Sequence, residues 1–107
     1  MKILYNVTVK IDTALNTEWL EWMKSVHIPD IMATSCFESY RIARIIGDDD
    51  EHGVGFAIQY IAPDMDTFQR YQSNFAKKLQ TDHSDRYKNH YVAFRTLMQI
   101  EEEGNWS

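Results

Sequence analysis

Residues 36–63 have the sequence CFESYRIARIIGDDDEHGVGFAIQYIAP, in which two segments rich in aromatic and β-branched residues flank a short acidic loop. The segments 36–46 and 54–62 predict two strands, and Pro63, which has no backbone N–H, ends the second one. Only seven residues, 47–53, separate the two strands. Because so short a loop cannot contain a crossover helix, the strands are predicted to form an antiparallel hairpin.

The chain before this hairpin predicts a strand followed by a helix. Residues 3–11 alternate between more and less apolar side chains, which is typical of a half-buried strand. Asn16 is the expected N-cap of the helix that follows. Pro29 lacks a donor and restricts the residue before it, so we expect this helix to stop or kink near His27 and to continue irregularly to Met32.

The chain after the hairpin predicts a second helix, capped by Asp64, and a last strand over residues 91 to about 100. The apolar face of this helix would consist of Phe68, Tyr71, Phe75 and Leu79. The element order is therefore βαββαβ. We expect one α+β domain over residues 1–107 with a ferredoxin-like fold, in which two helices cover one face of a four-stranded antiparallel sheet. Residues from about 101 to 107 would form a flexible acidic tail.

The other face of this sheet is predicted to be uncovered. We expect it to carry the less apolar side of each strand: Leu4, Asn6, Thr8, Ala57, Gln59, Ile61, Tyr91, Arg95 and Leu97. Such a mixture is too apolar to face water, so we predict a homodimer that forms through this face. For the strand 36–46, the side with Tyr40 and the side with Arg41 compete for the open face.

Charge and composition exclude several classes of protein. The formal charge of −5 disfavours binding to nucleic acid and to anionic membranes. The single Cys36 cannot form an internal disulfide, and no apolar segment has the length of a signal peptide core or a membrane span. We therefore expect a cytoplasmic protein. None of the four histidines shows metal-ligand spacing, so no metal is expected.

RNA binding is a weaker alternative, because βαββαβ is also the element order of RNA-recognition domains. Gly53, Gly55 and Phe56 fit the pattern of their third strand. Val54 and Gln59, however, occupy positions where that pattern has aromatic residues, and the four acids at 48–51 would repel phosphate.

Several motifs carry a resemblance to a known family: Trp19-Leu20-Glu21-Trp22-Met23, His27-Ile28-Pro29, Cys36-Phe37-Glu38-Ser39-Tyr40-Arg41, and Arg86-Tyr87 followed by Tyr91-Val92-Ala93-Phe94-Arg95-Thr96. Over essentially its whole length the chain resembles a bacterial family of short proteins known as a domain of unknown function, which is similar to dimeric α+β barrel proteins. The resemblance implies two ferredoxin-like subunits that pack their open sheet faces together.

The wider superfamily includes antibiotic-biosynthesis monooxygenases, haem-degrading monooxygenases, muconolactone isomerases and ethyl-tert-butyl-ether-degradation-like proteins. Several members carry His-x-Pro at the end of the first helix, where this chain has His27-Ile28-Pro29. Of the Asn, Trp and His set of the haem-degrading members, at most Asn6 is matched. The resemblance therefore gives no reason to expect haem, and we expect no cofactor.

His27 is the candidate catalytic residue, as a proton shuttle, because an imidazole titrates near neutral pH. Alternatively, His27 caps the last carbonyls of the first helix. Arginines present paired donors to a planar anion, and tyrosines in a pocket supply hydroxyl donors. The candidate ligand-binding residues are Asn6, Arg41, Tyr60, Tyr91 and Arg95.

Two functions fit this pattern. The first is a small-molecule-binding dimeric α+β barrel, acting as a cofactor-independent monooxygenase- or isomerase-like enzyme on a small anionic or aromatic compound. The second is a non-catalytic dimer whose barrel is filled by side chains and whose surface binds a partner. A cavity lined by His27 and an arginine would favour the first function, and a filled barrel would favour the second.

Overall fold

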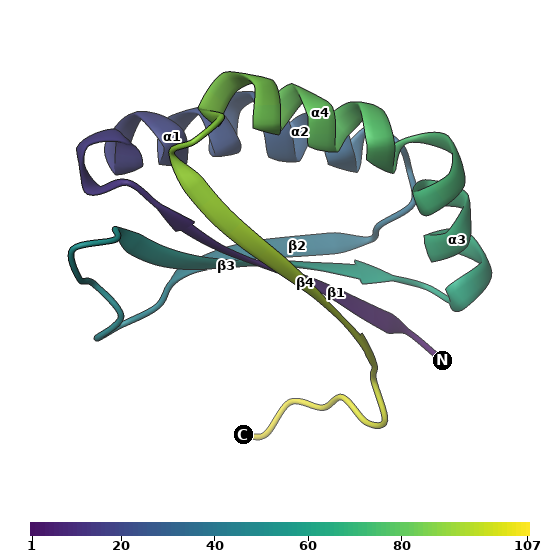
Figure 1. The fold of residues 1–107 in the computed structure, drawn as a ribbon. Coiled ribbons are helices and arrows are strands. Elements are labelled where there is room, and N and C mark those ends of the chain that lie inside the picture. Colours follow the sequence, from purple (N-terminus) through teal and green to yellow (C-terminus); the bar gives the residue numbers. More distant parts are fainter.

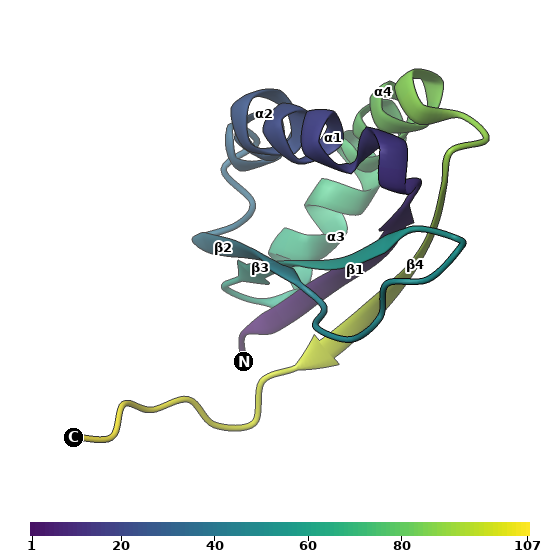
Figure 2. The ribbon, with the colours of Figure 1, turned by 90° about the vertical axis from the view of Figure 1, so that its left-hand side faces the viewer.

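The computed structural model describes residues 1–107, with a four-stranded antiparallel sheet below a layer of helices (Figure 1). The strands are β1 (Ile3–Ile11), β2 (Ser39–Arg44), β3 (Val54–Ala62) and β4 (Tyr91–Gln99), in the spatial order β2-β3-β1-β4. Figure 2 shows that the helices all lie on one face. The predicted ferredoxin-like α+β fold is confirmed.

Strand β2 is shorter than the predicted segment 36–46. Cys36 and Phe37 are buried in the core ahead of the strand, so their apolar character reflects packing under the helices and not pairing in the sheet. At the other end, Ile46 lies outside the strand and is 96% exposed. The predicted bounds of β1 and β3 are confirmed.

The first helical region has four segments: a 3₁₀ turn (Thr13–Leu15), α1 (Asn16–Trp22), a π-helical turn (Met23–His27) and α2 (Ile28–Met32). The prediction that Asn16 caps the helix is wrong, because Asn16 is already helical and its side chain donates back to the Thr13 carbonyl at 2.6 Å. The helix widens into the π turn immediately before Pro29 and does not stop. Since proline cannot donate to the preceding turn, this is where the regular hydrogen-bond ladder is interrupted.

The second helical region consists of α3 (Met65–Asn74) and α4 (Ala76–Tyr87), which meet at a break at Phe75 (φ −130°). The predicted cap is confirmed, since the Asp64 carboxylate accepts from the Thr67 N–H at 2.7 Å. Figure 1 shows α4 lying over the sheet beside α1 and α2, while α3 takes a steeper direction. No helix combines the length and the apolar character needed to cross a membrane.

The register decides which side of each strand faces the helices. Val7 lies opposite Ile58 on β3 and Arg95 on β4, so all three side chains share the helix side of the sheet. The open face was predicted correctly for β1 and β3. On β2 it carries Arg41, while Tyr40 is on the helix side.

For β4 the prediction of the open face is wrong. Tyr91, Arg95 and Leu97 lie on the helix side. The open face instead carries Val92, Phe94, Thr96 and Met98. The more apolar side of this edge strand was expected to pack beneath the helices, but the helices leave a cavity there, and the more polar side of β4 forms its wall.

Candidate functional site

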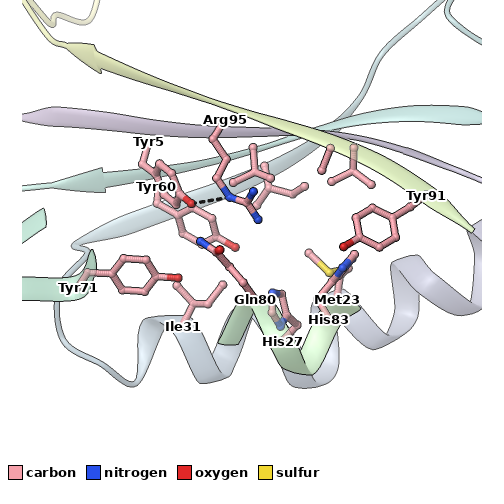
Figure 3. A pocket seen from close by; sticks show the side chains of 14 residues that line it. Tyr5, Met23, His27, Ile31, Tyr60, Tyr71, Gln80, His83, Tyr91 and Arg95 are labelled. Carbon is pink, nitrogen blue, oxygen red and sulfur yellow. Dashed lines mark hydrogen bonds between the residues drawn. The ribbon is translucent and has the colours of Figure 1, made fainter. Parts of the chain in front are cut away.

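A cavity lies between the sheet and the helices (Figure 3). Its volume is about 40 Å³, which is room for roughly three water molecules. Fourteen residues line it: Tyr5, Val7, Val9, Met23, His27, Ile31, Ile58, Tyr60, Tyr71, Gln80, His83, Tyr91, Ala93 and Arg95. Apolar side chains dominate this lining, and the polar groups form three sets that differ in chemistry.

Arg95 is the cation of the cavity. Its side chain extends from the edge strand β4 into the space between sheet and helices (Figure 3). The Nε–H donates to the Tyr5 hydroxyl at 3.0 Å. This bond orients the guanidinium and leaves its two terminal nitrogens available to a ligand.

Three tyrosines form one end of the cavity. The Tyr5 ring lies 6.0 Å from that of Tyr60 and 6.1 Å from that of Tyr71, measured between centroids, and all three side chains are buried. Burial raises the pKa of the Tyr5, Tyr60 and Tyr71 hydroxyls above that of free tyrosine. The phenols therefore stay protonated and act as neutral hydrogen-bonding groups.

Two histidines form the other end. The rings of His27 and His83 lie 5.5 Å apart, and Trp22 stacks on His27 at 5.0 Å. Burial lowers the pKa of His27 to about 4, although Asp30 and Asp82 oppose this shift. Burial also lowers the pKa of His83 to about 4, and the neighbouring His27 and Arg95 add to this shift. Both imidazoles are therefore neutral at pH 7.

The two histidines differ in their hydrogen bonds. The Trp19 indole Nε1–H donates to Nε2 of His83 at 2.9 Å in the buried core. The His27 side chain makes no capping hydrogen bond to the helix segments on either side of it. The alternative in which His27 caps helix carbonyls is therefore not supported.

The structure brings four of the six predicted site residues together. His27, Tyr60, Tyr91 and Arg95 all line the cavity. Asn6 and Arg41 lie on the opposite face of the sheet, where the Gln59 side chain donates to the side-chain oxygen Oδ1 of Asn6 at 3.2 Å and accepts from Nε of Arg41 at 2.7 Å.

Sequence reasoning missed Tyr71, Gln80 and His83 as lining residues. For His83 a signal exists, because it falls four residues after Leu79 and four before Tyr87, on the buried stripe of α4. No cluster of His, Cys, Asp or Glu side chains is arranged to hold a metal ion.

A family model described as Domain of unknown function (DUF4286) matches residues 2–101. The chain belongs to this family. The resemblance drawn from the sequence motifs, to a family of unknown function, is thereby confirmed. No protein of curated function matches the DUF4286 chain.

Solved structures similar to this DUF4286 protein share its fold at low sequence identity. A mutant of SnoaB, a cofactor-independent oxygenase from Streptomyces nogalater, is 11% identical, with a TM-score of 0.70 and 95% of each chain covered. A dimeric ferredoxin-like protein from an uncultured marine organism is 9% identical, with a TM-score of 0.71, over 96% of this chain and 98% of that one. An ethyl tert-butyl ether family protein from Bacillus halodurans is 11% identical, with a TM-score of 0.66, over 92% of this chain and 99% of that one.

Proposed function

We propose that this DUF4286 protein is a homodimeric, small-molecule-binding enzyme that transfers a proton on a small anionic or aromatic compound without a cofactor. The observation that carries the proposal is that Arg95, a permanent cation, and His27, a neutral base, line one small and mostly apolar cavity. The name of SnoaB, a cofactor-independent oxygenase with this fold, agrees with such chemistry. We also place the protein in the bacterial cytoplasm, consistent with its free and buried Cys36.

Arg95 would bind the anionic group of the ligand. A guanidinium presents two parallel donors to a carboxylate or an enolate, and its contact with Tyr5 fixes their direction. Arg95 is exposed to solvent on the edge strand and also lines the outer groove, so its guanidinium lies where a ligand enters the cavity. The same group stabilises negative charge as it develops on the oxygen of an enolate.

His27 would accept the proton. Its neutral ring is the form that can remove a proton from a carbon next to a carbonyl, which yields an enolate and an imidazolium. A bound anion beside the ring would raise the pKa of His27 from about 4 and so make it a better base. Return of the proton to another carbon gives an isomer, whereas reaction of the enolate with dioxygen begins a monooxygenation.

The cavity sets the size of the reacting group. About 40 Å³ holds only a few atoms, so the rest of a larger ligand must lie outside. Gln80, Tyr91 and Arg95 also line a groove on the outer surface between α4 and β4, which continues the cavity outward. The reacting oxyanion would lie inside and the remainder of the compound in this groove.

The test is a thermal unfolding screen of the wild type against small carboxylic acids and hydroxy-aromatic acids. We expect at least one acid to raise Tm, since a ligand that binds only the folded state stabilises it. The Arg95→Gln variant should lose this shift and the Arg41→Gln variant, a matched arginine on the other face of the sheet, should keep it.

Proton transfer is then followed by NMR, as deuterium uptake at the carbon beside the carbonyl of the acid that binds. We expect uptake with the wild type and none with His27→Gln. If no acid changes Tm and none takes up deuterium, the second function, a non-catalytic dimer, replaces the proposal.

A further inference from the structure

The hydrogen bond between Trp19 and His83 fixes the proton on the His83 ring. An indole N–H can only donate, so Nε2 of His83, at 2.9 Å, must accept and carries no hydrogen. A neutral imidazole holds its one proton on the other nitrogen, which is Nδ1. Both side chains are buried, Trp19 completely, so water does not compete with this bond.

The Nδ1–H of His83 has no partner in the protein, because Trp19 forms the only hydrogen bond of this ring. No buried side-chain nitrogen or oxygen is sealed off without a partner, so this nitrogen is accessible. The ring lines the cavity together with Arg95, while the Tyr91 ring packs perpendicular to it with centroids 4.5 Å apart. A hydrogen-bond acceptor on a ligand in the cavity can therefore reach the Nδ1–H of His83.

We propose that His83 is a neutral hydrogen-bond donor to the ligand's oxyanion, and that Trp19 is the positioning residue that holds it in the Nδ1–H tautomer. This inference rests on the proposed function and deepens it. The two cavity histidines then have opposite roles, because His83 is fixed as a donor while the ring of His27 is free to accept a proton.

The pair of donors narrows the class of ligand. Arg95 supplies a charged fork and His83 a single neutral donor, so the group between them must be rich in lone pairs. A carboxylate or an enolate oxygen meets this requirement, and a primary amide, with two hydrogens on its nitrogen, does not. The site should therefore bind acetate and discriminate against acetamide, which has nearly the same shape.

The tautomer is measured directly by long-range ¹H–¹⁵N NMR on protein labelled with ¹⁵N-histidine at pH 7. We expect a protonated Nδ1 and a bare Nε2 at His83, and a mixture of tautomers in Trp19→Phe, which lacks the indole donor. A protonated Nε2 in the wild type would overturn the proposal whatever ligand binds.

Binding is measured with acetate as the probe, by titration of the wild type and of two variants. An Asn amide places its nitrogen near the position of Nδ1, and a Gln amide places its end near that of Nε2. His83→Gln should therefore keep a partner for Trp19 but weaken acetate binding about tenfold, as expected for one lost hydrogen bond to a charged group. His83→Asn should retain most of the affinity.

Three outcomes separate this inference from the proposed function. If acetate binds the wild type and His83→Gln equally, His83 is not a donor, and the proposed function stands. If His83→Asn loses as much affinity as His83→Gln while both keep the wild-type circular dichroism spectrum, packing and not the donor is responsible, and the inference is overturned. If neither acetate nor any other small acid binds the wild type, the proposed function fails, and this inference fails with it.

Discussion

At the scale of single residues, two histidines line the cavity in their neutral form, whereas in the unfolded chain both become protonated at mildly acidic pH. Burial lowers the pKa of His27 and of His83 to about 4, against 6.5 for a free imidazole. Between about pH 4 and pH 6.5 the unfolded chain binds more protons than the folded one, so the free energy of unfolding decreases as the pH falls. We expect full stability above about pH 6.5 and a loss of about 1.4 kcal/mol per pH unit for each histidine below it.

Urea unfolding at pH 7, 6 and 5 measures this slope. Gln carries no titrating group, so His27→Gln and His83→Gln should each reduce the slope by about half, and the double variant should be nearly independent of pH in this range. A wild type whose free energy of unfolding is flat from pH 7 to 5 would show that the rings are not held neutral.

At the scale of elements, the β2–β3 hairpin depends on a glycine that lies against β1. Gly53 has φ +135°, and a Cβ there would overlap the carbonyl oxygen of Ile11. We expect Gly53→Ala to cost more than about 2 kcal/mol in urea unfolding, because strain and a backbone clash add. Gly47 is the matched control, with φ +84° and no atom within 4 Å of an added Cβ, so Gly47→Ala should cost only about 1 kcal/mol. Equal losses would contradict the role of the contact with Ile11.

The central strands β1 and β3 could be predicted from the sequence in both their bounds and their facing. The edge strand β2 was predicted too long, and β4 was predicted at the right place, 91 to about 100, but with the wrong side towards the helices. β1 and β3 each pair on both sides, so alternation is enforced along their whole length and marks their ends. The edge strand β4 has apolar residues on both sides, and only its register with β1 tells that Arg95 faces the cavity. The π turn before Pro29 is set by hydrogen-bond spacing, which composition does not record.

The candidate site was predicted only in part, because the sequence shows the chemistry of single residues and not which side chains the fold brings together. His27 and Arg95 were found from their chemistry, which is visible in one residue at a time. His83 became visible as a site residue only when α4 was placed over the sheet, since its partner Trp19 is 64 residues away in the chain. Asn6 and Arg41 have suitable chemistry, but strand alternation puts them on the other face.

At the scale of the whole molecule, the open face of the sheet has properties of an interface. Val92 is 70% exposed, Phe94 63% and Met98 40%, all on one side of β4. The polar residues beside them are already paired, since Asn6, Gln59 and Arg41 form a hydrogen-bonded chain. A second copy could therefore cover this face without leaving these groups unsatisfied.

We predict that Phe94→Glu converts a homodimer into a monomer. In a two-fold interface each substitution appears twice, so it removes two large apolar contacts and buries two carboxylates. The dissociation constant from sedimentation equilibrium should rise at least about 100-fold, which corresponds to about 2.8 kcal/mol. The control is Val26→Glu, because Val26 is also an exposed apolar residue (42%) but lies in the helical layer.

The cavity lies between the sheet and the helices, on the opposite face of the sheet from Phe94. Monomeric Phe94→Glu should therefore still bind the acid that stabilises the wild type, with an affinity within a few-fold of the wild-type value. Loss of binding together with dissociation would show instead that the second copy completes the site. A wild type that is monomeric at micromolar concentration, or a Val26→Glu variant that dissociates as readily as Phe94→Glu, would remove the open face as the interface.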